Sequence, residues 1–295
     1  MHRTSQIVLA VLAFVACLPL PLAAQSEETD PKKLEFDDIS KAMPMLMAPM
    51  RDGVRLATDV YLPKDEPGPF PVVFVKTPYD FNKIQGATLE WGLEAVKRGY
   101  AYVVQNERGR YYSEGEWELL GDPRQDGYDS LSWIAEQEWS NGNVGTLGCS
   151  STAEWQLALA AMDHPAHKAM IPMAAGAGIG RVGEFHEQGN YYKGGVHQTL
   201  MSVWLYGVQQ DVRPRFPDGM SSEELQRLRK MYDLAARMPK VEWSKHLSKL
   251  PQVDWLQSAG ANEGPGTELM QRGPDAPEWS RGGLYHDNEP LAVPA

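Results

Sequence analysis

Four short apolar runs, separated by stretches with helical spacing, constrain the fold of this chain more than any other feature. The runs are Val72–Val75, Tyr100–Val104, Val144–Leu147 and Met170–Met173. An unbroken apolar run is expected of a strand buried on both faces. The helical stretches between them are Thr88–Arg98, Tyr128–Ile134 and Ser151–Met162. Strands that alternate with helices in this way predict an α/β fold with a largely parallel sheet.

A β-hairpin is expected before this series. Met45–Met50 is apolar, Asp52-Gly53 is a turn pair, and Val54–Leu62 alternates apolar with polar residues. An Asp-Gly pair between two such runs is a strong hairpin signal. We therefore place the α/β core at residues 41–176.

The pattern changes after Gly176. We expect residues 177–260 to form a helical cap inserted over the sheet, including a helix that opens on the capping box Ser221–Glu224 and runs through Met238. Residues 261–295 are rich in Gly and Pro at first and end in the apolar run Leu291–Ala295. We interpret them as a loop followed by the start of the next core strand.

The N-terminus has the layout of a secretory signal peptide over residues 1–24. Arg3 supplies a positive charge, an apolar region follows, and Ala23-Ala24 offers small residues for cleavage. A membrane anchor is the alternative, but the apolar stretch before Pro19 is shorter than the ~20 residues that a spanning helix needs. A lipoprotein modified at Cys17 is a second alternative. We expect export to the periplasm or the outside, no stable membrane insertion, and a flexible lead-in over residues 25–40.

Charge and cysteine content exclude several classes of protein. The formal net charge is −11, from 28 basic and 39 acidic residues, whereas a nucleic-acid binder usually carries a basic face. Cys149 is the one cysteine that remains after the signal peptide, so no intramolecular disulfide is expected. His164 and His167 flank Pro165 and are interpreted as a helix end rather than metal ligands. The sequence indicates no metal and no cofactor.

The segment Gly145–Glu154 carries the strongest chemical signal. A short strand ends, Ser150 sits at the turn, and a helix follows. This is the layout of the nucleophile elbow of α/β-hydrolases, in which the Ser151 N–H would form one arm of an oxyanion hole. The pattern departs from Gly-x-Ser-x-Gly, because Thr152 takes the last place. The alternatives are a serine that merely caps the helix, or Ser151 as nucleophile, which would put Cys149 where Gly is wanted.

The residues around the elbow resemble the CocE/NonD hydrolases, relatives of the X-Pro dipeptidyl-peptidases, cocaine esterase and the α-amino-acid ester hydrolases. The resemblance covers roughly residues 50–195. The segments that carry it are Met50–Leu56, Asp59–Tyr61, Thr77–Tyr79, Arg108–Arg110, Ser113–Gly115, Asp126–Asp129, Trp133-Ile134, Trp139–Gly142, Val144-Gly145 and the elbow as far as Gln156. Together, in this order and spacing, they are specific.

The resemblance implies roles for individual residues. Ser150 would be the nucleophile, and Tyr79 would donate its hydroxyl to the oxyanion; the alternative for Tyr79 is a packed loop tyrosine. The family usually has a tyrosine after its serine, where this chain has Ser151. Because the second oxyanion arm is a backbone group, it survives this change. For Arg108, Arg110, Asp126 and Asp129 we favour structural roles, with the arginines in ion pairs that hold the loop over residues 107–121.

The rest of the catalytic triad is not evident in this chain. Such enzymes follow the order Ser, Asp, His, and the resemblance implies that both partners and a C-terminal jelly roll come after the cap. We interpret Ala292–Ala295 as the start of the strand that leads to the aspartate, so that the sequence is truncated before these parts. Two internal pairs have the right order, Asp254 with His286 and Asp211 with His246, but both lie in cap-like or loop sequence.

The sequence therefore predicts an exported serine hydrolase that acts on a small-molecule or peptide acyl substrate, an ester or an amide, including X-Pro dipeptidyl or α-amino acyl groups, and that is incomplete as given. The alternative is a non-catalytic binding protein on the same scaffold. A metal or nucleotide enzyme is disfavoured, because the chain has no P-loop and no dinucleotide motif. Four aromatic residues are either acyl-pocket or packing residues: Tyr191, Tyr192, Trp204 and Tyr206.

Overall fold

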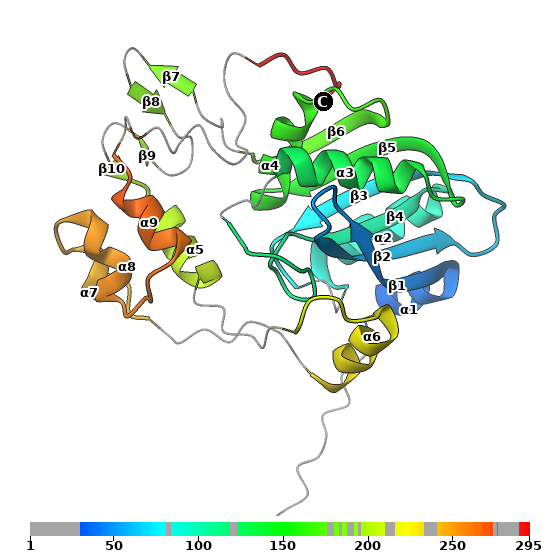
Figure 1. Cartoon of the computed structure of the whole chain (residues 1–295), viewed down its shortest axis with the longest axis horizontal. Coiled ribbons are helices and arrows are strands. Elements are labelled where there is room, and N and C mark those ends of the chain that lie inside the picture. Colours follow the sequence, from blue (N-terminus) through cyan, green and yellow to red (C-terminus); the bar gives the residue numbers. More distant parts are fainter. Residues whose placement is uncertain are drawn as a thin grey trace, which may run out of the picture.

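The computed structural model describes residues 30–80, 84–118, 123–175, 180–182, 185–187, 192–193, 196–209, 216–232, 241–273, 276 and 289–295. Its centre is a six-stranded sheet in the order β1-β2-β4-β3-β5-β6 (Figure 1). The strands are β1 (Ser40–Pro49), β2 (Arg55–Pro63), β3 (Phe70–Thr77), β4 (Ala101–Asn106), β5 (Ser140–Cys149) and β6 (His167–Met173). Strands β3 to β6 pair in parallel, and β1 and β2 add an antiparallel edge. The predicted α/β fold, the largely parallel sheet and the hairpin are confirmed.

Two layers of helices cover the sheet. Helices α1 (Pro31–Ile39) and α2 (Gly86–Lys97) bury their apolar residues with Val75, Tyr102 and Val104. Helices α3 (Pro123–Ala135) and α4 (Ser151–Ala160) pack with Phe74 and Val103 on the other face. Neighbouring strand residues thus belong to opposite clusters, which follows from the two-residue period of a strand. It explains why the central strands are apolar without a break.

The lead-in over residues 25–40 was expected to be flexible, but most of its described part is a helix. Its described part begins at residue 30 and forms α1, which Asp30 caps by accepting from the Lys32 N–H. Phe36 is fully buried against α2 and the sheet. Ile39 packs on the same cluster, and Lys32 and Glu35 pair with Glu90 and Lys97 of α2, so several contacts together order a segment whose composition is polar.

The cap lies to one side of the sheet and has a small core of its own (Figure 1). Its helices are α5 (Thr199–Gln209), α7 (Ser244–Leu247), η1 (Gln252–Asp254), α8 (Trp255–Ser258) and α9 (Pro265–Gln271), and its short strands are β7 (Gly180–Val182), β8 (Phe185–Glu187), β9 (Tyr192–Lys193) and β10 (Val196–His197). The buried cluster is Leu205, Tyr206, Trp255, Leu256, Leu269 and Met270. A loop was expected where helix α9 lies. The helix is stabilised because it buries Leu269 and Met270 in the cap core.

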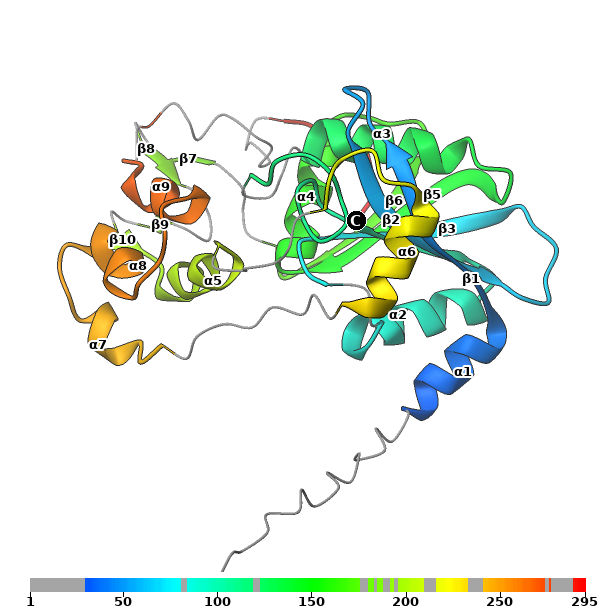
Figure 2. The same cartoon turned by 60° about the horizontal axis from the view of Figure 1, so that its bottom comes forward.

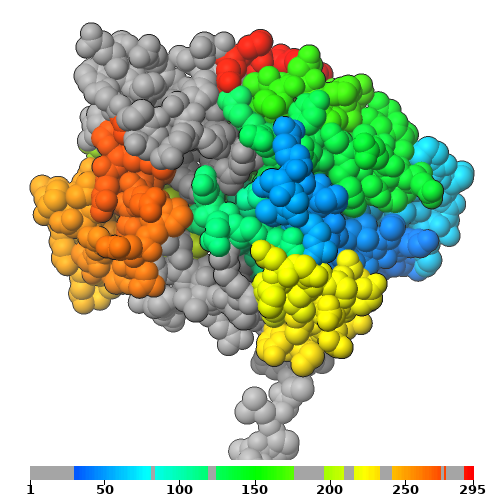
Figure 3. Space-filling view, in the orientation of Figure 1, coloured from blue at the N-terminus to red at the C-terminus, as the bar shows by residue number. Residues whose placement is uncertain are grey.

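Helix α6 (Ser222–Met231) leaves the cap and docks on the hairpin edge of the core. Figures 2 and 3 show it in yellow against the blue N-terminal segments, apart from the orange cap helices. Both bonds of the predicted capping box at Ser221 and Glu224 are present, and the helix ends at Met231. Its Arg229 pairs with Asp59, which is 1% exposed, at 2.8 Å.

The last residues run beside the outer strand β6. Val293 is buried with Ala160 and Met170, and the Pro294 carbonyl accepts a 2.9 Å hydrogen bond from the Met170 N–H. The backbone here is irregular, so the strand start expected at residues 292–295 is not a regular strand in this structure. The position is nevertheless that of a seventh strand beside β6.

Among the described residues, no helix combines the length and apolar character that crossing a membrane requires. The signal peptide predicted over residues 1–24 lies outside the described residues.

Candidate active site

Ser150 stands at a sharp turn between β5, which ends at Cys149, and α4, which begins at Ser151. Its backbone has φ 58° and ψ −127°, a conformation that L-residues rarely adopt and that persists only where the surroundings impose it. The turn is fixed by a 3.0 Å bond from the Ser150 N–H to the Met173 carbonyl. The side chain is exposed and does not cap α4. The alternative of an ordinary capping serine is therefore wrong.

The small neighbours of the turn have a steric cause. A Cβ added to Gly148 would lie 2.0 Å from the Thr152 carbonyl oxygen, so only glycine fits there. Thr152, which replaces the expected second glycine, turns its hydroxyl back into the elbow. Its Oγ1 accepts from the Cys149 N–H and donates to the Cys149 carbonyl, each at 2.7 Å. The departure from Gly-x-Ser-x-Gly is thus compatible with the turn.

Tyr79 is brought to the elbow by the loop that follows β3. Its N–H donates to Thr77 Oγ1 at 3.1 Å, and Asn106 Nδ2 donates to its carbonyl at 2.7 Å. These bonds fix the loop at the carboxyl ends of β3 and β4. The Tyr79 hydroxyl then lies 2.9 Å from Ser151 Oγ, and the residue remains 40% exposed. The alternative of a tyrosine packed away in a loop does not fit this exposure.

The start of α4 supplies a second donor at the same place. As the first N–H of the helix, the Ser151 amide has no intrahelical acceptor, and the helix dipole favours negative charge there. The three predicted site residues, Ser150, Tyr79 and Ser151, are therefore adjacent. A serine hydroxyl thus has a phenol hydroxyl and a backbone N–H close to it, and these are the types of donor that oxyanion holes use.

In the described part of the chain, no hydrogen bond joins a histidine to Ser150. His167 begins β6, pairs across from Val144 near the amino end of the parallel strands, and bonds Thr146 Oγ1 at 2.9 Å. His164 bonds Ser132 Oγ at 3.0 Å, and His246 bonds Ser258 Oγ at 3.0 Å. Asp211 and His286, one member of each internal pair considered above, lie outside the described residues.

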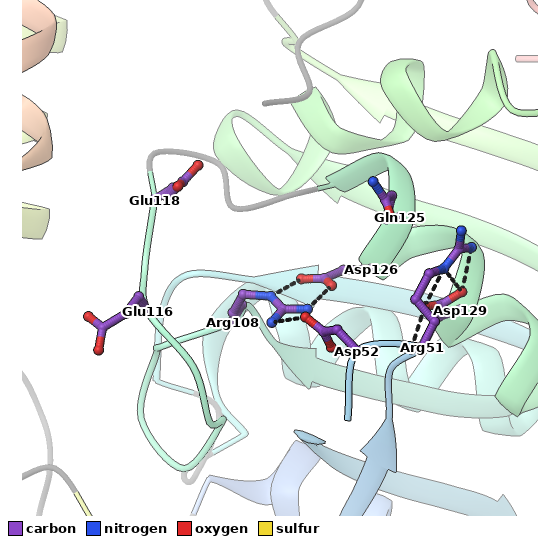
Figure 4. Close-up of a pocket in the computed structure, with 8 residues that line it drawn as sticks. All are labelled: Arg51, Asp52, Arg108, Glu116, Glu118, Gln125, Asp126 and Asp129. Carbon is purple, nitrogen blue, oxygen red and sulfur yellow. Dashed lines mark hydrogen bonds and ion pairs between the residues drawn. The ribbon is translucent and has the colours of Figure 1, made fainter. Parts of the chain in front are cut away.

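A charged cavity of about 300 Å³ opens beside the hairpin turn (Figure 4). Arg108 donates to Asp126 at 2.6 Å and to Asp52 at 2.7 Å, and its hydrogen bonds raise its own pKa and lower that of Asp52. Arg51 forms a second pair with Asp129 at 2.7 Å. The structural roles expected for Arg108, Asp126 and Asp129 agree with these pairs.

Arg110 also holds the loop, through a hydrogen bond and a ring contact. Its Nε donates to the Pro78 carbonyl at 2.9 Å, and its guanidinium lies over the Trp117 ring, 5.0 Å from the centroid.

Beside Arg110, burial raises the pKa of Glu107 to about 7. Glu107 is not among the residues predicted above, although its place directly after the buried strand β4 could have indicated it. Within the described residues, no group of three or more potential ligands is arranged to hold a metal ion.

Among the described cap residues, Trp204 reaches Tyr79. Trp204 of α5 donates its indole N–H to the Tyr79 hydroxyl at 2.8 Å. Tyr206 follows the packing alternative: it is buried in the cap, where its hydroxyl bonds the Ala259 carbonyl and its ring packs on Trp243. Tyr191 and the side chain of Tyr192 lie outside the described residues.

Comparison with known proteins places the chain in a family. A family model described as X-Pro dipeptidyl-peptidase (S15 family) matches residues 52–295. The chain belongs to the S15 family. Cocaine esterase from a Rhodococcus species is 45% identical over 141 residues, which are 46% of this chain and 24% of the esterase. The expected resemblance is thereby confirmed.

One solved structure supports the fold of this S15 family member. An α-amino acid ester hydrolase superposes with a TM-score of 0.55 at 22% identity, covering 82% of this chain and 39% of that protein. A CocE/NonD family hydrolase from Staphylococcus aureus is 26% identical over 57% of this chain and 32% of its own, with a TM-score of 0.45. The matches span well under half of each relative.

Proposed function

We propose that this chain carries the nucleophile and the oxyanion-binding groups of a CocE/NonD-type serine hydrolase. The observation that carries the proposal is the strained, exposed Ser150, whose neighbour Ser151 supplies the first N–H of α4 and bonds the Tyr79 hydroxyl through its side chain. Backbone strain of this kind clusters at functional sites. A structural serine at an ordinary strand-to-helix turn would need neither the strain nor the exposure.

The mechanism follows from the positions of these groups. Ser150 Oγ attacks the carbonyl carbon of the substrate and forms an acyl-enzyme, and the leaving alcohol or amine departs with a proton. The carbonyl oxygen becomes negatively charged and accepts hydrogen bonds from Tyr79 Oη and the Ser151 N–H. Removing one such donor typically costs about 10²–10³-fold in kcat. Water then hydrolyses the acyl-enzyme by the same route.

A general base is needed because a serine hydroxyl is a weak nucleophile at its own pKa. We place this histidine, and the aspartate that orients it, in sequence that follows Ala295. Two observations support this placement. The side chains of His164, His167 and His246 are hydrogen-bonded to residues other than Ser150. Residues 293–294 lead the chain along the outer edge of β6, beside the strand that ends next to the elbow.

Esters are the first substrates to test, with X-Pro and other α-amino acyl amides as the second class. The name of the 45% identical relative points to esters, and the family description points to X-Pro dipeptides. Export is a further part of the proposal and rests on residues 1–24. Mass spectrometry of the mature protein should find an N-terminus near residue 25; an intact Met1 would contradict export.

The deciding experiment compares two forms of the protein on p-nitrophenyl esters and X-Pro p-nitroanilides. One is the 295-residue chain, and the other extends it through the downstream reading frame. We expect turnover by the extended form, loss of turnover in its Ser150→Ala variant, and little turnover by the short form. If the extended form hydrolysed neither substrate class, the alternative of a binding protein on this scaffold would replace the proposal.

A further inference from the structure

The hydroxyl of Tyr79 is a junction of three separate parts of the fold. Ser151 Oγ, from the first residue of α4, lies 2.9 Å away, and Trp204 Nε1, from α5 of the cap, lies 2.8 Å away. Ser151 is buried, whereas Tyr79 is 40% exposed. The phenol oxygen is therefore held from two sides while its surface remains open to a ligand.

The hydrogen-bonding capacity of a phenol limits what this junction can do. A tyrosine hydroxyl has one hydrogen and two acceptor lone pairs, and an indole N–H can only donate. Trp204 therefore occupies one lone pair of the Tyr79 oxygen. If Ser151 donates its own hydrogen, it occupies the second lone pair. The Tyr79 hydrogen then has neither neighbour as an acceptor and remains available to the substrate.

Formation of the oxyanion favours this arrangement of hydrogens. A hydrogen bond to a charged acceptor is roughly twice as strong as one between neutral groups, so the Tyr79 hydrogen is drawn to the oxyanion rather than to Ser151 Oγ. Ser151 then turns to donate. Donors to the Tyr79 oxygen also polarise its O–H bond and strengthen the bond that it donates.

We propose that the Ser151 hydroxyl and the Trp204 indole are positioning donors that fix and polarise Tyr79 for oxyanion binding. Ser151 thus serves both arms of the oxyanion hole, one through its backbone N–H and the other through Tyr79. This inference rests on the proposed function. It adds a role for the Ser151 side chain and for a cap residue that neither the nucleophile nor the backbone donor requires.

A second contact ties the same cap helix to the Tyr79 loop. Arg110 donates from Nε to the Pro78 carbonyl at 2.9 Å and from a terminal nitrogen to the Val208 carbonyl of α5 at 3.3 Å. Arg110 is 7% exposed. Val208 lies one turn after Trp204 on α5, so the buried Arg110 side chain links this helix to the Tyr79 loop. This link supports a defined position for the Trp204 indole.

The test uses the extended form of the protein defined above, called the full-length protein from here on, with p-nitrophenyl acetate as the substrate. We expect Tyr79→Phe to lower kcat about 100-fold. We expect Ser151→Ala, which keeps the backbone N–H, to lower kcat about tenfold, as loss of one hydrogen bond predicts, and to leave KM within about twofold. Trp204→Phe should behave like Ser151→Ala. Ser151→Thr keeps a hydroxyl and should restore most of the activity, and Ser248→Ala on the exposed helix end is the matched control.

The double variant Ser151→Ala/Tyr79→Phe separates positioning from other roles. If Ser151 acts through Tyr79, the double variant should be no slower than Tyr79→Phe alone. A further tenfold loss in the double variant, or an equal loss in Ser151→Thr and Ser151→Ala, would overturn the inference. If the wild type is active, Ser150→Ala is inactive and Ser151→Ala has full activity, the inference fails alone. If the wild type is inactive, or Ser150→Ala is fully active, the proposed function fails with it.

Discussion

The elbow and the charged cavity make an instructive pair, because both lie at the carboxyl ends of the parallel strands and both are rich in polar residues. In the cavity, Arg108 and Arg51 meet the carboxylates of Asp126, Asp52 and Asp129 in ion pairs (Figure 4). At the elbow, Ser150 is exposed, makes no capping bond and sits on strained backbone. The charged residues of the cavity pair with one another, whereas the Ser150 side chain makes no capping bond.

Internal pairing of the side chains is what separates the structural cavity from the proposed catalytic site. Charges that satisfy one another stabilise the loop and the hairpin but leave little for a ligand. Groups whose hydrogen-bonding capacity is unused, and whose backbone is strained, are the ones poised for chemistry. Substitutions in the cavity should therefore change stability, and substitutions at the elbow should change turnover.

The largest expected effect is that of Ser150→Ala. It should lower turnover of the full-length protein at least about 10⁴-fold, while the free energy of unfolding changes by no more than about 0.5 kcal/mol. Ester hydrolysis and chemical denaturation measure the two quantities. Unchanged turnover, or a large loss of stability, would contradict the claim that the elbow governs turnover and the cavity governs stability.

Asp126→Asn is the matching substitution in the charged cavity. Asp126 is 1% exposed and accepts from Arg108 at 2.6 Å. Removing one partner of a buried pair typically costs about 3–5 kcal/mol, because the other charge is left uncompensated. Denaturation should show this loss of stability, and kcat per folded molecule should stay within about twofold. A stable variant with much reduced kcat would instead place Asp126 in the catalytic machinery.

His167 tests whether a histidine at the opposite end of β6 takes part in the chemistry. Burial lowers its pKa from 6.5 to about 4. Because the unfolded chain binds the proton first as the pH falls, the stability that depends on His167 is full above about pH 6.5 and declines towards pH 4, by up to about 3 kcal/mol. In His167→Asn this decline should be absent and kcat unchanged. A large fall in kcat would contradict the assignment of the base to another residue.

Arg51→Gln should have the smallest effect. The Arg51 side chain is 51% exposed, and such pairs contribute about 0–1 kcal/mol. We expect a loss of less than about 1 kcal/mol by denaturation, less still at high salt, and no change in turnover. A loss as large as that of Asp126→Asn would show that the whole cavity acts as one network rather than as a buried pair and an exposed one.

The core could be predicted from the sequence because its signals are local. The apolar runs, the Asp52-Gly53 turn and the capping box at Ser221 each depend on neighbouring residues, and all of them agree with the structure. The elbow could also be predicted from the sequence, because Ser150 lies between a strand and a helix with Gly148 two residues before it.

The rest depends on contacts between residues far apart in the chain. Helix α1 is ordered by the burial of Phe36 and by ion pairs with α2, and α9 by apolar residues that join the cap core. The hydrogen bond from Trp204 to Tyr79 joins residues 125 positions apart, so no local sequence pattern could predict it. Tyr206 shows the same limit, because its spacing did not reveal that it faces the interior of the cap rather than the site.

The most direct test of the account is to treat the full-length protein with a fluorophosphonate probe and to find the modified residue by mass spectrometry. The account predicts labelling at Ser150, none in Ser150→Ala, and none in the 295-residue chain by itself. Absence of label from the full-length protein, or label on another serine such as Ser151, would contradict the claim that the strained serine between β5 and α4 is the nucleophile.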